Sequence, residues 1–134
     1  MSRMLFLNLP VADLDKSVAF FTSLGFEFNA DFTDENATAM VVNDQATVML
    51  LVRDFFSTFT DKSIADTTTS IEGLYALSAD SREDVDGVID RAVAAGGREP
   101  RPRKDEGFMY GGAFEDLDGH VWEVMWMDPT AMQG

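Results

Sequence analysis

The order of strand-like and helix-like segments repeats along this chain, and the repeat limits the fold more than any single motif. An apolar stretch at 4–11 precedes a helical pattern at 14–24, and three strand-like stretches follow at 26–32, 37–43 and 46–52. After a polar connection, the same order returns between 72 and 127. We therefore predict two βαβββ modules, an internal repeat at the level of supersecondary structure.

The ends of the two predicted helices carry ordinary capping signals. Asp13 is placed to cap the first helix, and Gly25 is placed to end it. Asp80 or Ser81 can cap the second helix, which Gly96 and Gly97 should end. The stretch at 98–103, which contains two prolines, is predicted as an edge strand, because proline cannot donate to a central ladder.

Each module predicts a four-stranded sheet with one face covered by its helix, which places the chain in the α+β class. Two such sheets side by side can curl into an open, partly closed mixed β-barrel around a cavity. We expect one domain over 1–134, with a first module at about 1–53, a connection at about 54–70 and a second module at about 71–128.

Charge and composition exclude several classes of function. The net charge of −14 disfavours binding to nucleic acid or to anionic membrane lipid. The absence of cysteine excludes disulfides and thiolate chemistry, and fits a cytoplasmic location. The N-terminal residues do not have the pattern of a secretory signal or a membrane span.

Two motifs in this order, NLPVADLDKSVAFFTSLGF at 8–26 and FEDLDGHVWEVMW at 114–126, resemble the vicinal oxygen chelate superfamily. That group includes glyoxalase I, bleomycin and fosfomycin resistance proteins and extradiol dioxygenases, and the chain looks most similar to small bacterial predicted lactoylglutathione lyases. The resemblance covers essentially the whole chain. It implies the glyoxalase/bleomycin resistance/dioxygenase fold and a homodimer.

In metal-dependent members of that group, a divalent ion is held by four side chains. The corresponding positions here are Phe6, Leu50, Leu74 and Glu123. Only Glu123 can coordinate a metal, so we predict that the chain has no metal cofactor, with a divalent ion as the disfavoured alternative. Asn8 shares a strand face with Phe6, but an amide oxygen is a poor ligand for borderline ions.

The same positions predict a ligand site. The predicted ligand-binding residues are Phe6, Asn8, Leu50, Leu74, Tyr110, Glu123 and Met125. Glu123 is also the one candidate catalytic residue, and its structural alternative is a pair with an arginine or a hydrogen bond to Asn8 or Tyr110. We expect His120 to be a turn residue, and Arg101 and Arg103 to be solvated edge charges that could instead meet an anion.

Three functions remain open from the sequence. The first is binding of a small organic molecule, which could be cationic, in an apolar cavity beside Glu123. The second is metal-dependent chemistry of the lactoylglutathione lyase kind, which the resemblance implies and the apolar residues oppose. The third is metal-free proton transfer by Glu123. The expected partners are a small-molecule ligand and a second copy of the chain, with no nucleic acid or membrane.

Overall fold

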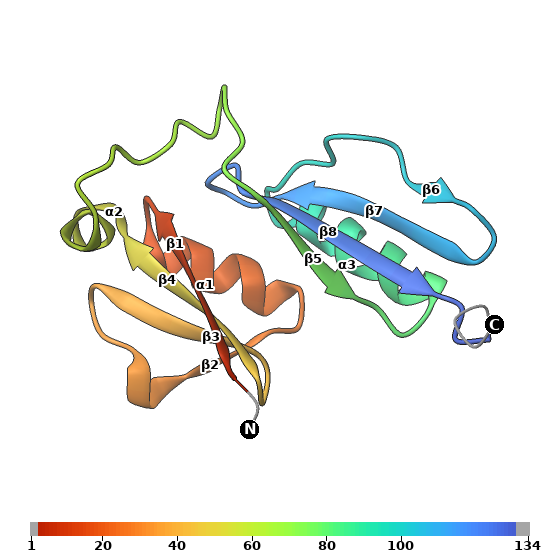
Figure 1. Ribbon diagram of the computed structural model, residues 1–134, viewed down its shortest axis with the longest axis horizontal. Helices are drawn as coiled ribbons and strands as arrows, with labels where there is room; N and C mark the ends of the chain where they lie inside the picture. Colours follow the sequence, from red (N-terminus) through yellow and green to blue (C-terminus); the bar gives the residue numbers. More distant parts are fainter. Residues whose placement is uncertain (1–2, 131–134) are drawn as a thin grey trace. The chain divides into compact units, whose positions relative to one another are not determined.

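A computed structural model of the protein describes residues 3–130. The chain forms two compact units, one up to Ala65 and one from Asp66 onward. The first unit contains β1 (Leu5–Val11), α1 (Leu14–Ser23), β2 (Glu27–Asn29), the short 3₁₀ helix η1 (Ala30–Phe32), β3 (Ala37–Asn43), β4 (Ala46–Val52), α2 (Arg53–Phe56) and η2 (Ser57–Phe59). The second contains β5 (Leu74–Ser78), α3 (Arg82–Ala94), β6 (Lys104–Asp105), β7 (Met109–Glu115) and β8 (Val121–Met127) (Figure 1).

The two units have the same sheet topology. The strand order is β1-β4-β3-β2 in the first sheet and β5-β8-β7-β6 in the second. In each sheet the first and last strands of the module run parallel, and the other pairs are antiparallel. The predicted α+β class and the two βαβββ modules are confirmed.

The predicted helix caps are confirmed in detail. The carboxylate of Asp13 accepts a hydrogen bond from the amide of Lys16 at 3.1 Å, and Gly25 follows the helix with φ of 101°. Ser81 rather than Asp80 caps α3, because its hydroxyl accepts from the amide of Asp84 at 3.0 Å. These local bonds satisfy backbone donors that have no partner within the helix.

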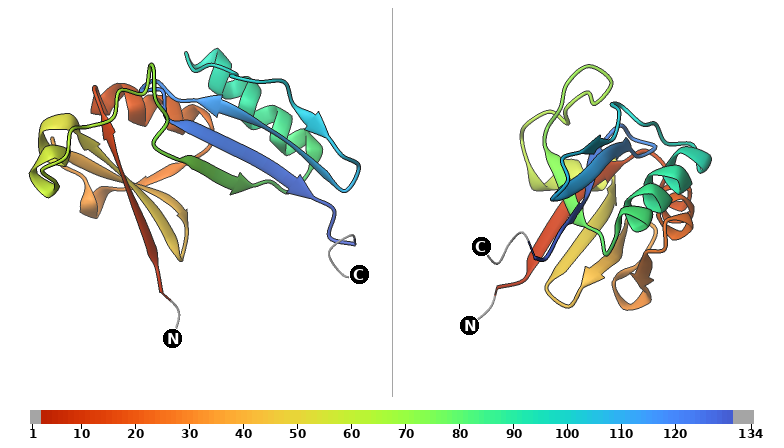
Figure 2. Two further views of the ribbon diagram at one scale, coloured as in Figure 1. Left: turned by 45° about the horizontal axis from the view of Figure 1, so that its top comes forward. Right: turned by 90° about the vertical axis from the view of Figure 1, so that its right-hand side faces the viewer.

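In each unit, the long helix covers one face of the sheet, and the buried core of that unit lies between the helix and the sheet. In the first unit, Phe20 and Phe21 of α1 are buried together with Leu9, Val48 and Leu50. In the second, Val85 and Ile89 of α3 are buried together with Phe114, Trp122 and Val124, and Figure 2 shows α3 lying along its sheet. We call the opposite side of each sheet its open face. Among the described residues, no helix is long and apolar enough to span a membrane.

Two predicted strands are shorter than the sequence indicated. The stretch at 26–32 leaves the sheet after Asn29, whose side chain accepts a hydrogen bond from the amide of Asp31 at 3.0 Å and starts η1. The stretch at 98–103 lies at the sheet edge as predicted, but only Arg98 forms a bridge there, to Glu115. Pro100 and Pro102 lack the N–H groups that a continuous strand would need, so β6 begins later, at Lys104.

Candidate functional site

Phe6 lies on the open face of the first sheet. It is paired in register with Thr47, and Asn8 is paired with Met49, so all four side chains emerge on the same side. The side chain of Phe6 is 56% exposed, although a phenyl group gains free energy when it is removed from water. The open face therefore presents aromatic surface that the first unit leaves uncovered.

The predicted placement of Leu50 is wrong. Leu50 pairs in register with Leu9, is fully buried, and lies on the face covered by α1 rather than on the face of Phe6. Its neighbour Met49 occupies the open face. Side chains alternate along a strand, so an error of one residue moves a side chain to the other side of the sheet.

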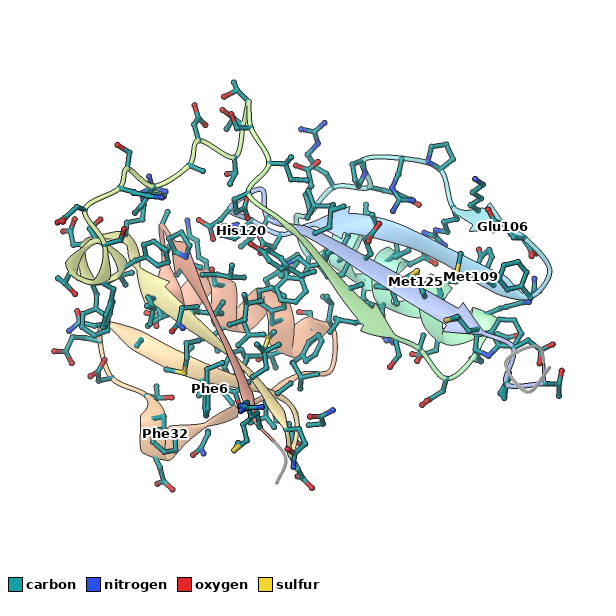
Figure 3. All side chains as sticks on the ribbon, viewed as in Figure 1. Phe6, Phe32, Glu106, Met109, His120 and Met125 are labelled. Atoms are coloured by element: carbon teal, nitrogen blue, oxygen red, sulfur yellow. The ribbon has the colours of Figure 1, made fainter. Side chains whose placement is uncertain are left out.

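A groove of about 230 Å³ is hollowed into the open face of the first sheet. The side chains that line it are mainly apolar and come from β1, η1, β3, β4 and the residue before β1: Met4, Phe6, Phe32, Val41, Thr47 and Met49, with Asn29 and Ala39 completing the lining. Figure 3 labels Phe6 and Phe32 within this unit, and Phe32 is 65% exposed. Among the described residues that line the groove, none is charged, which suits a neutral apolar group.

Three of the other predicted residues share the open face of the second sheet. Leu74 of β5 pairs with Val121, and Glu123 and Met125 of β8 follow on the same side by strand alternation. Leu74 is 58% exposed. Glu123 has alanines on both neighbouring strands, Ala76 on β5 and Ala113 on β7, so the strands beside it add little bulk.

Glu123 forms an ion pair with Arg101 instead of lying alone in a dry cavity. Nη2 of Arg101 lies 2.5 Å from Oε2 of Glu123, and the side chains are 47% and 22% exposed, respectively. The structural alternative that the sequence left open, a pair with an arginine, is therefore the arrangement found. Arg101 is not simply a solvated edge charge, because its guanidinium is directed over the open face.

Tyr110 lies on the opposite side of the sheet from Glu123, so the predicted grouping of these two residues is wrong. Tyr110 pairs in register with Trp126 and donates a hydrogen bond from its hydroxyl to Oδ1 of Asp86 on α3 at 2.6 Å. This hydrogen bond raises the pKa of Tyr110 and lowers that of Asp86. Tyr110 was predicted to bind the ligand, but its phenol serves to join β7 to α3.

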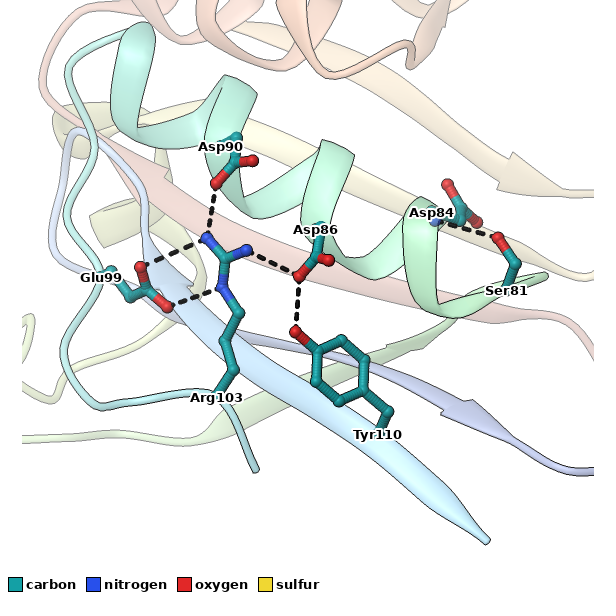
Figure 4. Close-up of polar contacts among 7 residues, drawn as sticks. All are labelled: Ser81, Asp84, Asp86, Asp90, Glu99, Arg103 and Tyr110. Atoms are coloured by element: carbon teal, nitrogen blue, oxygen red, sulfur yellow. Dashed lines mark hydrogen bonds and ion pairs between the residues drawn. The ribbon is translucent and has the colours of Figure 1, made fainter. Parts of the chain in front are cut away.

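Arg103 is the centre of an ionic cluster that the sequence did not reveal (Figure 4). Its guanidinium bonds to Asp86 at 2.7 Å, to Asp90 at 2.6 Å and to Glu99 at 2.9 Å. Hydrogen bonds to Glu99 and Asp90 raise the pKa of Arg103, so the group stays charged. In the sequence, this ionic cluster was indicated only by the basic residues gathered at 98–104. Two of the acidic partners of Arg103, Asp86 and Asp90, come from the preceding helix and could not be assigned to it.

His120 is buried and belongs to a second cluster that was missed. Its Nδ1 lies 2.7 Å from Oε1 of Glu72, in the segment before β5. Asp116, also buried, accepts hydrogen bonds from the amide of His120 at 3.1 Å and from Nε1 of Trp122 at 3.0 Å. Burial raises the pKa of Asp116. The DLDGH motif thus organises the turn between β7 and β8 within the second unit.

The vicinal oxygen chelate proteins that the chain resembles use four positions to bind a metal, and the residues at these positions here do not form a suitable ligand set for a divalent ion. Phe6 and Leu74 have no donor atom, and the position on β4 is filled by Met49 on the open face or by Leu50 beneath it. Glu123 is the only strong ligand, and it is bound to Arg101. Among residues 3–130, no group of three or more histidine or acidic side chains is arranged to hold a metal.

Comparison with known proteins connects the fold to one structural group. Residues 3–43 match a family described as bleomycin resistance protein-like N-terminal. The chain superposes with TM-score 0.79 on hypothetical protein SA1046 from S. aureus, at 29% identity over 94% of both chains. A glyoxalase/bleomycin resistance protein/dioxygenase family enzyme from Burkholderia phytofirmans gives TM-score 0.77 at 16% identity, over 94% of this chain and 99% of that one.

A third structure with the same fold is a resistance protein. Fosfomycin resistance protein FosX from Mesorhizobium loti superposes with TM-score 0.65 at 15% identity, over 100% of this chain and 97% of its own. No curated protein matches the sequence. At these identities the superpositions establish the fold, and the family match is confined to residues 3–43.

Proposed function

We propose that this chain, which has the fold of glyoxalase/bleomycin resistance/dioxygenase proteins and matches a bleomycin resistance protein-like family over residues 3–43, binds a small organic molecule on the open face of its first sheet. The proposal places the ligand in the groove of the first unit. It does not require a chemical step. It agrees with the match of residues 3–43 to a family named for resistance to bleomycin.

The observation that carries the proposal is the exposed aromatic and thioether surface around Phe6. Phe6, Phe32 and Met4 are each more than half exposed, and with Met49 they line one groove. Exposed apolar side chains that converge on a concave surface are typical of a ligand site. Methionine adapts its shape to different partners, which favours aromatic molecules of varied outline.

Glu123 is already bonded to Arg101, and this pair limits the roles that its carboxylate can have. A cationic ligand, the option that the sequence raised, would have to displace a guanidinium that is already bonded to this carboxylate. Proton transfer by Glu123 would also require the ion pair to open first. Metal-dependent lyase chemistry is not proposed, because three of the four side chains at the metal positions do not supply a strong ligand.

The test is equilibrium binding of a neutral aromatic probe, benzamide, followed by NMR or by intrinsic fluorescence. We expect Phe6→Ala to weaken binding about tenfold, because it removes one aromatic wall of the groove. Phe59→Ala is the matched control, since Phe59 is also exposed but lies on η2, outside the groove lining. Equal affinities for the parent and Phe6→Ala, or an absence of binding, would contradict the proposal.

The homodimer suggested by the resemblance is part of the proposal. Exposed apolar residues on both open faces, Phe6 and Leu74 among them, provide surface that a second copy could cover. Light scattering at micromolar concentration should report twice the mass of the chain. A monomeric mass across the whole concentration range would remove the second copy from the proposal and leave the groove.

A further inference from the structure

Arg101 is presented by a segment that is fixed along the edge of the second sheet. At one end, Arg98 exchanges two backbone hydrogen bonds with Glu115, at 3.1 and 2.7 Å. At the other, β6 pairs Lys104 with Gly111. Pro100 and Pro102 each fix their own φ and restrict the residue before them. The backbone around Arg101 therefore has few alternative conformations.

The side chains of this segment divide between the two faces of the sheet. Glu99 and Arg103 bond to each other, and Arg103 also bonds to Asp86 and Asp90 on α3, which places both on the covered side. Arg101, midway between them, reaches Glu123 on the open face. The Arg103 cluster thus holds the segment in the position from which Arg101 reaches over the sheet.

Gly112 makes this arrangement sterically feasible. A Cβ atom at position 112 would lie 2.9 Å from Cγ of Arg103 and 2.8 Å from Cδ1 of Ile89. The absence of a side chain lets the stem of Arg103 cross β7 on its way to α3. The position of Arg101 therefore rests on a glycine, two prolines and an ionic cluster.

The guanidinium of Arg101 retains most of its hydrogen-bonding capacity. Only Nη2 is engaged among the described residues, and a guanidinium carries five N–H donors. Nearly half of the side chain is exposed. Because Glu123 holds one nitrogen, the N–H groups on another edge of the planar guanidinium can bind a second oxyanion. A guanidinium commonly binds an oxyanion through two parallel hydrogen bonds.

Apolar surface lies on the same face. Leu74, Val121 and Met125 share the open face with Glu123. A positive fork beside exposed apolar surface suits a molecule with an anionic head and an apolar body. A cation has no comparable place, since its natural partner Glu123 is already bonded.

We propose that Arg101, held by Glu123 at one nitrogen, is an anchor for a small amphipathic organic oxyanion, a carboxylate or a phosphonate, on the open face of the second sheet. This inference rests on the proposed function, binding of small organic molecules, and adds a class of ligand for the second unit taken by itself. Arg103 acts as a positioning residue for Arg101. The chain would then select anions at this point, despite its overall charge of −14.

The test compares four probes that share a phenyl ring: benzoate, phenylphosphonate, neutral benzamide and cationic benzamidine. We expect one of the two anions to bind at least about fivefold more tightly than benzamide at low salt, and the advantage to shrink as salt is added. The better of the two anions identifies the preferred oxyanion. Arg101→Ala should remove the advantage while leaving benzamide binding unchanged.

The matched control is Lys104→Ala, which deletes one positive charge from the same segment at a side chain that is 76% exposed. It should leave the preference for anions intact. Glu123→Gln keeps an oxygen for Arg101 but removes the competing negative charge, so anion binding should strengthen. Preferential binding of benzamidine, or equal binding of the anions and benzamide, would overturn the inference alone. Failure of all four probes would overturn the proposed function with it.

Discussion

Nδ1 of His120 lies 2.7 Å from Oε1 of Glu72, and this contact ties the residue before β8 to the segment before β5. An ionised carboxylate can only accept, so Nδ1 carries the shared proton. The hydroxyl of Tyr75 also donates to the same oxygen, at 3.1 Å. Burial and the neighbouring Glu72 carboxylate raise the pKa of Tyr75, which stays neutral as a donor. Glu72 thus accepts from two side chains of the second unit.

Substitution of Glu72 by glutamine should destabilise the second unit. The glutamine amide keeps an oxygen for His120 but loses the charge that strengthens the hydrogen bond, so we expect the free energy of unfolding to fall by about 1 kcal/mol at pH 7. Chemical denaturation monitored through Trp122 and Trp126 measures this change. Glu35→Gln, at an exposed position on the first unit, should have no comparable effect.

The same pair predicts how stability depends on pH. Burial acts to raise the pKa of Glu72, but the hydrogen bond from His120 and the other interactions outweigh it, and the pKa lies below its ordinary value of 4.5. An acid with a depressed pKa in the folded state stabilises the fold above its ordinary pKa, and this contribution is lost as pH falls through the folded value. The stability difference between the parent and Glu72→Gln should therefore be constant near neutrality and shrink below about pH 4.5. A difference that grows on acidification would contradict this assignment.

Arg103→Met tests the ionic cluster on α3. Methionine preserves much of the apolar stem, while Asp86, Asp90 and Glu99 lose their shared cation, so we expect a loss of about 2 kcal/mol in the free energy of unfolding at low salt. The loss should be smaller in high salt, because screening weakens both the lost attraction and the repulsion among the acids. Lys104→Met, which removes one exposed ion pair with Glu106, should cost much less. Identical effects for the two variants would show that the cluster adds no more stability than one exposed ion pair.

Gly112→Ala should disturb the packing of β7 against α3. The new Cβ would lie 2.8 Å from Ile89 and 2.9 Å from Arg103, so both side chains must move, and we expect a cost of about 1–3 kcal/mol in thermal or chemical unfolding. The matched control is Gly87→Ala within α3, where the nearest atoms belong to Arg91 at 3.6 Å. That change should stabilise the helix by about 0.5–1 kcal/mol, because alanine has the higher helix propensity. A neutral Gly112→Ala would mean that Arg103 has room to shift.

The repeated order of elements was predictable because its signals are local. Asp13 and Ser81 cap helices through bonds to residues three positions away, and both are visible in the sequence. Alternation along β8, which is visible in the sequence, puts Trp122 and Val124 on the side of the helix and Glu123 on the other. These features depend on backbone geometry over a few residues, which the order of amino acids determines directly.

The candidate site was only partly predictable. Which side chains share a face depends on the exact position of each residue in its strand, and which charges pair depends on residues that are distant in the chain. A shift of one residue separates the buried Leu50 from Met49 on the open face, and composition alone does not distinguish two apolar neighbours in one strand. Tyr110 was placed on the wrong face for the same kind of reason.

The two βαβββ modules and the ends of their helices follow from the order of amino acids alone, and so does the lack of a strong ligand at three of the four metal positions that the resemblance implies. The partner of Glu123, in contrast, is apparent only in the folded protein: it is Arg101, 22 positions away in the chain. The tertiary structure likewise joins His120 to Glu72 across 48 positions. Such ion pairs form because sheet register and helix packing bring the charges within a few ångströms of each other, and no local pattern in the chain encodes that distance.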